Sequence, residues 1–117
     1  MRKLLFILFI YSLVSCHSGM SSRVPAGVAT PDSMVVILTD VHILQASIQI
    51  GYFQGDTSNS VHKAFEDLWK KHHLSEETYN KSIQFYTYHP ALLNLIYEQV
   101  LSNLSQQKAE LLGKKHT

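Results

Sequence analysis

The chain has 117 residues, of which 45% are hydrophobic, and its formal net charge is +1 with histidine neutral. This length supports one domain with a modest core, and the balanced charge gives no basic stripe of the kind that nucleic-acid binding requires. The single cysteine excludes an internal disulfide framework and a zinc site built from several thiolates.

The beginning of the chain has the pattern of a bacterial lipoprotein signal. Arg2 and Lys3 form a basic start, and the uncharged apolar residues 4–14 are too few to span a membrane. Cys16 follows this run at the position of the lipidated cysteine in the bacterial lipobox. The preceding residues that resemble the lipobox are Leu13, Val14 and Ser15. The alternative is an ordinary signal peptide whose cleavage region contains a free thiol.

The resemblance to bacterial lipoproteins implies that Cys16 carries a thioether-linked diacylglycerol and often a further acyl chain on its new amino group. Two or three acyl chains hold a protein at a membrane almost permanently, and we expect no other cofactor. His17 stands where an Asp would retain an enterobacterial lipoprotein at the inner membrane, and no acidic run marks surface export. We therefore expect a protein that is anchored in the outer membrane and faces the periplasm.

Composition divides the chain into segments. Residues 17–30 are small, polar and interrupted by Pro25 and Gly27, which is typical of a flexible tether. The expected segments are a signal peptide at 1–15, the lipidated cysteine and tether at 16–30, a helical domain at 31–113 and a tail at 114–117.

The domain begins with two expected helices. Thr30 is a suitable N-cap for the first helix, with Pro31 at the first helical position. Its apolar stripe is Met34, Ile37, Leu38, Val41, Leu44, Ile48 and Tyr52. After a loop at residues 54–59, Ser60 is expected to cap the second helix. The stripe of that helix is Val61, Ala64, Phe65, Leu68, Trp69 and His72. Its polar face carries three i, i+4 pairs: Lys63 with Asp67, Glu66 with Lys70, and Asp67 with Lys71.

Two further helices are expected in the second half. Ser75 is expected to cap the third helix, whose stripe is Tyr79, Ile83 and Tyr86. This helix should end before Pro90, which disfavours helical conformation in the preceding residue and suits the first turn of a new helix. Gly113 stands at the expected C-cap of that fourth helix. No alternating strand pattern is present, so the sequence predicts an all-α fold, a small four-helix assembly with short connections.

Three segments of the domain resemble a known family. They are "PDSMVVILTDVHILQA" from residue 31, "FEDLWKKHHLSEETYNKSIQFYTYHP" from residue 65 and "LLNLIYEQVLSNL" from residue 92. The family consists of small Bacteroidetes lipoproteins and is catalogued as domain of unknown function 4296. The matching positions are Pro31, Met34, Asp40, His42, Tyr86, His89, Pro90, Ile96, Tyr97, Val100 and Leu101. His73-Leu74 departs from the glycine-containing turn of that family. The resemblance implies a location and a fold, but no activity.

Seven histidines raise the alternative of a metal or haem binder. No His-Glu-x-x-His arrangement is present. Asp40 and His42 are two residues apart and lie on nearly opposite helix faces, whereas His62 and Glu66 share a face but provide too few ligands for zinc. A metal site could still be assembled from different helices, and this would require three histidines to meet: His42, His72 and His89. We expect structural roles for His42, beside the first stripe, and for His89, at the helix break.

Enzyme motifs are also absent from the sequence. There is no glycine-rich phosphate loop and no Gly-x-Ser-x-Gly elbow. Adjacent acidic pairs such as Glu76-Glu77 point about 100° apart on a helix and do not suit paired acid and base catalysis. We therefore expect a protein that is not an enzyme, with an unrecognised enzyme as the least favoured alternative.

The aromatic residues favour a binding role. Tyrosine and tryptophan are enriched in binding hot spots, although helical stripes of them are more often core. Phe85 falls beside the Ile83–Tyr86 line. The candidate motif and binding residues are Asp40, His42, Trp69, Phe85, Tyr88, His89 and Pro90. The leading hypothesis is a membrane-tethered module that docks a protein or peptide partner in the periplasm.

Overall fold

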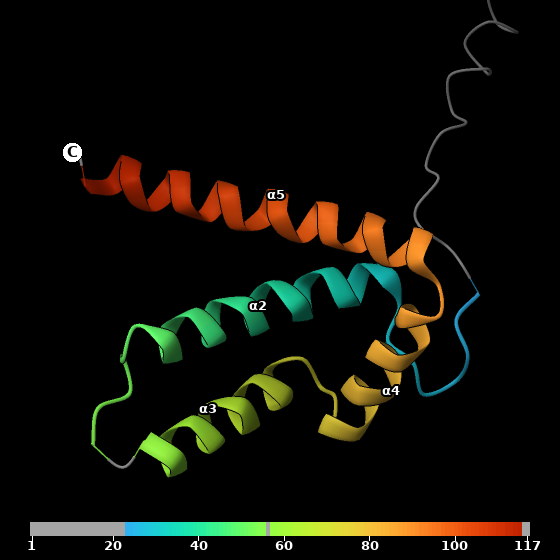
Figure 1. The fold of residues 1–117 in the computed structure, drawn as a ribbon, viewed down its shortest axis with the longest axis horizontal. Helices are drawn as coiled ribbons and strands as arrows, with labels where there is room; N and C mark the ends of the chain where they lie inside the picture. The colour runs from blue at the N-terminus through green and yellow to red at the C-terminus, as the bar shows by residue number, and fades with distance from the viewer. Residues whose placement is uncertain (1–22, 56, 116–117) are drawn as a thin grey trace, which may run out of the picture.

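The computed structural model describes residues 23–55 and 57–115, which fold into helices without a strand (Figure 1). The helices are α2 (Pro31–Gln49), α3 (Thr57–Lys71), α4 (Glu76–Thr87) and α5 (Pro90–Lys115). This confirms the predicted all-α, four-helix assembly for this part of the chain. The predicted signal peptide, Cys16 and the first part of the tether lie outside the described residues. Among the described helices, none is sufficiently long and apolar to cross a membrane.

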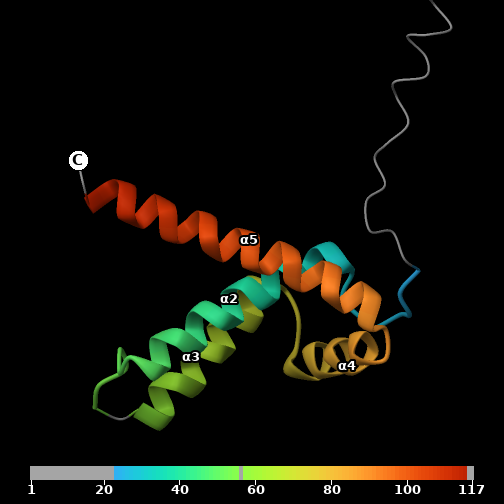
Figure 2. The same ribbon diagram turned by 45° about the horizontal axis from the view of Figure 1, so that its top comes forward.

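Helix α2 lies at the centre of the assembly. It runs between α5 and α3, while α4 packs against the first part of α5 (Figures 1 and 2). Thr30 caps α2 as predicted, because its hydroxyl accepts a hydrogen bond from the Ser33 amide at 3.3 Å. The buried hydrophobic residues are Met34, Val35, Ile37, Leu38 and Val41 of α2, Leu68 of α3, Tyr86 of α4, and Ile96 and Val100 of α5. The core is therefore one cluster built around α2.

The predicted stripe of α2 is too long at its C-terminal end. Gly51 adopts a φ of +72°, and its amide donates to the Ile48 carbonyl while the Tyr52 amide donates to the Ser47 carbonyl. These bonds form a Schellman motif, which terminates the helix and turns the chain away. The prediction that Tyr52 continues the buried stripe is wrong, because its side chain is 74% exposed.

Two other predicted helix ends are wrong. Helix α3 begins at Thr57 and not after Ser60, and the Thr57 amide and hydroxyl both donate to the Gly55 carbonyl, at 2.8 and 3.1 Å. Helix α5 runs through Gly113 to Lys115. Lys114 and Lys115 favour this extension, since cations stabilise the negative end of a helix.

Residues of the predicted tether lie against the helices. Val24, Val28 and Ala29 pack on the core. The Ala29 amide donates to Ser82 Oγ at 2.8 Å, and Tyr86 Oη donates to the Ala29 carbonyl at 2.6 Å. Burial raises the pKa of Tyr86 to about 12, so its phenol stays protonated as a donor. The packed part of the chain therefore begins near Val24 and not at Pro31.

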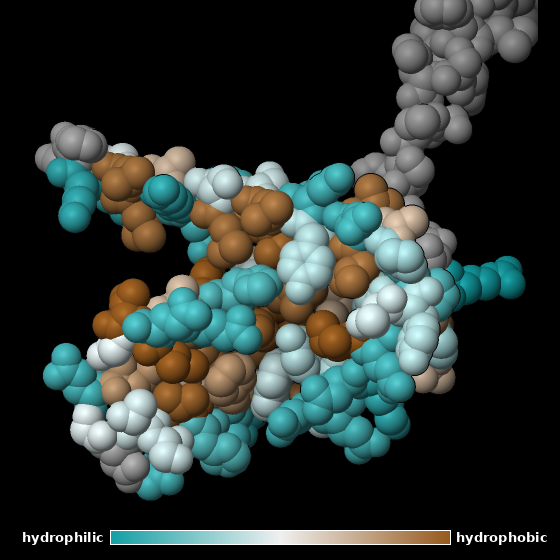
Figure 3. All heavy atoms as spheres, viewed as in Figure 1, coloured by the Kyte–Doolittle hydropathy of each residue, from teal (hydrophilic) through white to brown (hydrophobic). Residues whose placement is uncertain are grey.

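The part of α5 from Leu101 onward carries exposed apolar side chains. Leu101 is 62% exposed, Leu111 67% and Leu112 51%. Figure 3 shows hydrophobic surface along this part of α5, which extends as an arm beside the rest of the molecule. The buried core residues of α5 are Ile96 and Val100, and Leu104 packs partly buried against them, so the core involves the part of α5 up to this residue.

The turn after α3 contains a residue in an unfavourable backbone conformation. His73 has a φ of +52°, and the bonds from the His73 amide to the Lys70 carbonyl and from the Leu74 amide to the Trp69 carbonyl form a second Schellman motif. This left-handed conformation favours glycine, because the Cβ of any other residue crowds the backbone there. The departure from a glycine-containing turn thus leaves the turn geometry intact.

We predict that His73→Gly raises the free energy of unfolding by about 0.5–1 kcal/mol, because glycine removes the cost of the left-handed conformation. Urea denaturation followed by circular dichroism measures this change. His73→Ala is the matched control and should give no such gain, since alanine retains the unfavourable conformation. Destabilisation by His73→Gly would show that the imidazole contributes more than the backbone conformation costs.

Candidate functional site

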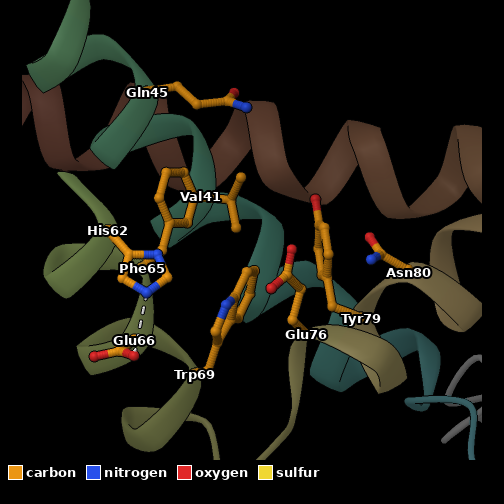
Figure 4. A pocket seen from close by; sticks show the side chains of 9 residues that line it. All are labelled: Val41, Gln45, His62, Phe65, Glu66, Trp69, Glu76, Tyr79 and Asn80. Atoms are coloured by element: carbon orange, nitrogen blue, oxygen red, sulfur yellow. Dashed lines mark ion pairs between the residues drawn. The ribbon is translucent and has the colours of Figure 1, made fainter. Parts of the chain in front are cut away.

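A groove of about 480 Å³ lies between α2, α3 and α4 (Figure 4). It is lined by Val41, Gln45, His62, Phe65, Glu66, Trp69, Glu76, Tyr79 and Asn80. Of the residues singled out from the sequence as candidate binding positions, Trp69 alone lies in this groove. The remaining lining residues come together because the short turn at residues 72–75 brings the first turns of α4 close to the C-terminal end of α3, where the ring centroids of Trp69 and Tyr79 are 4.8 Å apart.

Three aromatic rings form one wall of the groove. Phe65 and Trp69 are one helical turn apart on α3, with ring centroids 5.9 Å apart, and the centroids of Trp69 and Tyr79 are 4.8 Å apart. All three side chains are partly buried. Burial, with a smaller contribution from Tyr97, raises the pKa of Tyr79, so its phenol is neutral at ordinary pH. The wall therefore offers apolar ring faces that solvent still reaches.

Polar side chains form the rim of the groove. The His62 imidazole lies 3.3 Å from the Glu66 carboxylate, which is drawn as the dashed line in Figure 4. Glu66 therefore pairs with His62 and not with the predicted Lys70. Gln45 and Asn80 add amide groups, and the Glu76 side chain projects into the same space as the rings of Trp69 and Tyr79 (Figure 4). The lining contains two carboxylates and no lysine or arginine.

Asp40 joins α2 to the end of α3. Its Oδ2 accepts from Lys71 Nζ at 2.7 Å and from His72 Nε2 at 2.8 Å. Burial alone would raise the pKa of the Asp40 carboxyl, but the hydrogen bonds and charges of Lys71 and His72 outweigh burial and lower this pKa. Lys71 thus bonds to α2 instead of forming its predicted pair with Asp67. The predicted pair of Lys63 with Asp67 is confirmed at 3.5 Å.

The three histidines of the metal hypothesis lie apart. His72 bonds to Asp40, His42 packs on the Tyr97 ring of α5 at a centroid distance of 5.9 Å, and His89 stacks on Phe85 at 4.2 Å. Among the described residues, no group of three or more histidine, cysteine or acidic side chains is placed to hold a metal ion. Asp40 and His42 meet different helices, as their spacing on α2 predicts.

The other candidate residues surround a second, more open hollow at the junction of α4 and α5. Phe85, Tyr88, His89 and Pro90 line it. Tyr88 is 76% exposed, whereas Phe85 is partly buried against the core. The His89 Nδ1 donates to the Phe85 carbonyl of α4 at 2.8 Å. That carbonyl lies in the last turn of α4 and also accepts from the Tyr88 amide at 3.2 Å, so the imidazole adds a second hydrogen bond at this helix end.

His89 also begins the next helix through its backbone. Its carbonyl accepts from the Leu93 amide at 3.0 Å, which is the first turn of α5. The imidazole of His89 therefore bonds to the last turn of α4, and its backbone carbonyl bonds to the first turn of α5. This supports the structural role expected for His89 and for Pro90, which occupies the first position of α5.

Sequence reasoning missed most of the groove. Phe65 and Trp69 were expected on one stripe, and His62 and Glu66 on one face, but nothing in their spacing places them opposite Glu76 and Asn80 of α4. The signal that could have found the groove is the short turn after residue 71, which requires the C-terminal end of α3 and the N-terminal end of α4 to lie side by side.

The helices and the groove together define a small all-α protein. The chain belongs to the family described as Domain of unknown function (DUF4296), whose model matches residues 25–110. This range includes Val28 and Ala29, which precede α2 and pack on the core. The match confirms the family resemblance seen in the sequence. No curated protein and no solved structure matches the chain.

We predict that Asp40→Asn lowers the free energy of unfolding at neutral pH by about 1–3 kcal/mol, because a neutral amide replaces the charged, partly buried carboxylate that accepts both hydrogen bonds. The pKa of the Asp40 carboxyl is lower in the folded chain, so this stabilisation is present above the ordinary aspartate pKa and disappears as the pH falls through the folded value. Urea denaturation at several pH values measures both effects.

The matched control for that experiment is Asp67→Asn. Asp67 also pairs with a lysine, but its side chain is 57% exposed, and exposed pairs contribute little. A stability of Asp40→Asn equal to that of the control, with an unchanged acid unfolding profile, would contradict the role assigned to Asp40.

Proposed function

We propose that this protein is a lipid-anchored module of the bacterial envelope that docks a protein or peptide partner in the groove between α2, α3 and α4 and catalyses no reaction. The observation that carries the proposal is the wall of three partly exposed rings: Phe65, Trp69 and Tyr79. Large rigid side chains of this kind supply contact area at low entropic cost and dominate binding hot spots. A groove with apolar walls and a few polar groups is the usual form of a binding site.

The lipid anchor is supported by the order of the N-terminal residues. A basic start, an apolar run and the sequence Leu13-Val14-Ser15-Cys16 occur together. Val24, where packing on the core begins, follows Cys16 by eight residues. Such a segment spans at most about 28 Å, so an anchored chain would keep the helical domain near the bilayer. With His17 after the cysteine, the proposed location is the outer membrane, facing the periplasm.

We predict that Cys16→Ala abolishes lipidation. In the wild-type chain, mass spectrometry should find an N-terminal Cys16 peptide that carries acyl chains, and the variant should yield no acylated peptide and retain residues 1–15. His17→Ala is the matched control and should be lipidated normally. A processed wild-type chain with an unmodified Cys16 thiol would contradict the anchor.

We predict that a photo-crosslinking amino acid, benzoylphenylalanine, captures a discrete protein partner in intact cells when it replaces Asn80 at the edge of the groove. The same amino acid at Gln99, an exposed position of α5 outside the groove lining, is the control and should give no such product. Gel electrophoresis and peptide sequencing identify the product. Failure at Asn80 and also at His62, with normal amounts of the chain present, would contradict docking in this groove.

A further inference from the structure

We propose that the groove receives a positively charged side chain, an arginine or lysine, from a protein or peptide partner. This inference rests on the proposed function and specifies the chemistry of the partner. It is carried by three features of the groove, which are the sign of its charge, its aromatic wall and the placement of its amide groups.

The charge of the lining is negative. Glu66 and Glu76 enter it from different helices, and no lysine or arginine lines it. Glu76 is exposed at the first position of α4 and forms no ion pair within the described residues. Its neighbour Glu77 provides a contrast, because that carboxylate lies 2.9 Å from Lys81 Nζ and outside the groove. The carboxylate that faces the groove is therefore the one available to an incoming cation.

The aromatic wall suits the same group. A cation is attracted to the face of an aromatic ring, most strongly to tryptophan, and the long apolar stem of arginine or lysine packs on neighbouring rings. Trp69 stands between Phe65 and Tyr79 in the wall, so a cationic head near Glu76 would leave its stem against these rings (Figure 4). An acidic side chain would meet two carboxylates instead, and a purely apolar one would leave Glu76 facing it without a partner.

The amide groups favour a peptide over a small free cation. Gln45 of α2 and Asn80 of α4 line opposite sides of the groove (Figure 4). Each side-chain amide both donates and accepts hydrogen bonds, as backbone peptide groups do. A side chain bound between the rings would thus have its own backbone within the region of these amides.

Trp69 is the single tryptophan of the chain, so its fluorescence reports directly on the groove. The experiment titrates the full chain, purified in a neutral detergent, with the capped peptide Gly-Leu-Arg-Leu-Gly. The control peptide carries citrulline, which has nearly the shape of arginine but no charge. We expect a saturable change in emission with the arginine peptide and binding of the citrulline peptide that is about tenfold weaker.

Two variants assign the charge effect to the groove. Glu76→Gln should weaken binding of the arginine peptide about threefold to tenfold, because it removes the carboxylate beside the rings. Glu77→Gln removes the same charge from the adjacent residue outside the groove and should leave the affinity unchanged. Both sites are exposed, so these substitutions should preserve the fold, which circular dichroism checks.

Several results would overturn the inference. Equal affinity for the two peptides would indicate an apolar occupant, and equal losses in the two variants would indicate attraction to overall charge. A change in emission when the chain alone is diluted would place a second copy in the groove. No saturable response at millimolar peptide would also overturn it. If a partner is nevertheless crosslinked at Asn80, the docking function stands and only its charge preference is refuted.

Discussion

The burial of α2 is the constraint on which the rest of the structure depends. Met34, Leu38 and Val41 of this helix are almost fully buried, and Ile96 and Val100 of α5 pack in the same cluster. Full burial of each such side chain contributes about 1.5–3 kcal/mol, which is a large share of the stability of a domain of this size. Helices α3 and α5 hold their places by packing on α2, so the path of α2 sets the arrangement of the molecule.

The groove follows from this arrangement. Helix α3 is fixed at its C-terminal end by Asp40 of α2, and the turn through His73 directs the chain into α4. Helix α4 is fixed separately, through the hydrogen bonds of Ser82 and Tyr86 with Ala29 and by packing on α5. The two helices therefore converge at residues 72–75 and leave a space in front of α2.

The aromatic side chains have divided roles in this small domain. Tyr86 is completely buried and belongs to the core, whereas Phe65, Trp69 and Tyr79 remain partly exposed along the groove. A domain with a modest core gains stability from each ring that it buries. The remaining exposed surface of these three neighbouring rings is not buried by folding. Its burial against a partner would be favourable, which accords with a binding surface.

The proposed lipid anchor and the groove would serve different parts of the proposed role. An anchor restricts the protein to the membrane surface, so a partner in the same compartment is met at a raised local concentration. The hydrogen bonds of Ala29 with Ser82 and Tyr86 fix the point where the segment before α2 joins the helices.

The sequence alone determined the elements whose signals are local. The starts of three helices were predictable from Thr30, Ser75 and Pro90, because a cap hydroxyl or a proline ring acts on the backbone within one helical turn. Helix ends were less predictable. Gly51 ends α2 and Gly113 does not end α5, because Gly51 adopts a left-handed conformation and Gly113 stays helical.

Only the tertiary structure decided which side chains meet. Asp40 with Lys71 and His72, and Trp69 with Tyr79, join residues on different helices, and no period along the chain encodes such pairs. A stripe shows which face of a helix is buried, but not which helix covers it or at what angle. Those choices depend on the simultaneous packing of all the helices around α2, and they produced the groove.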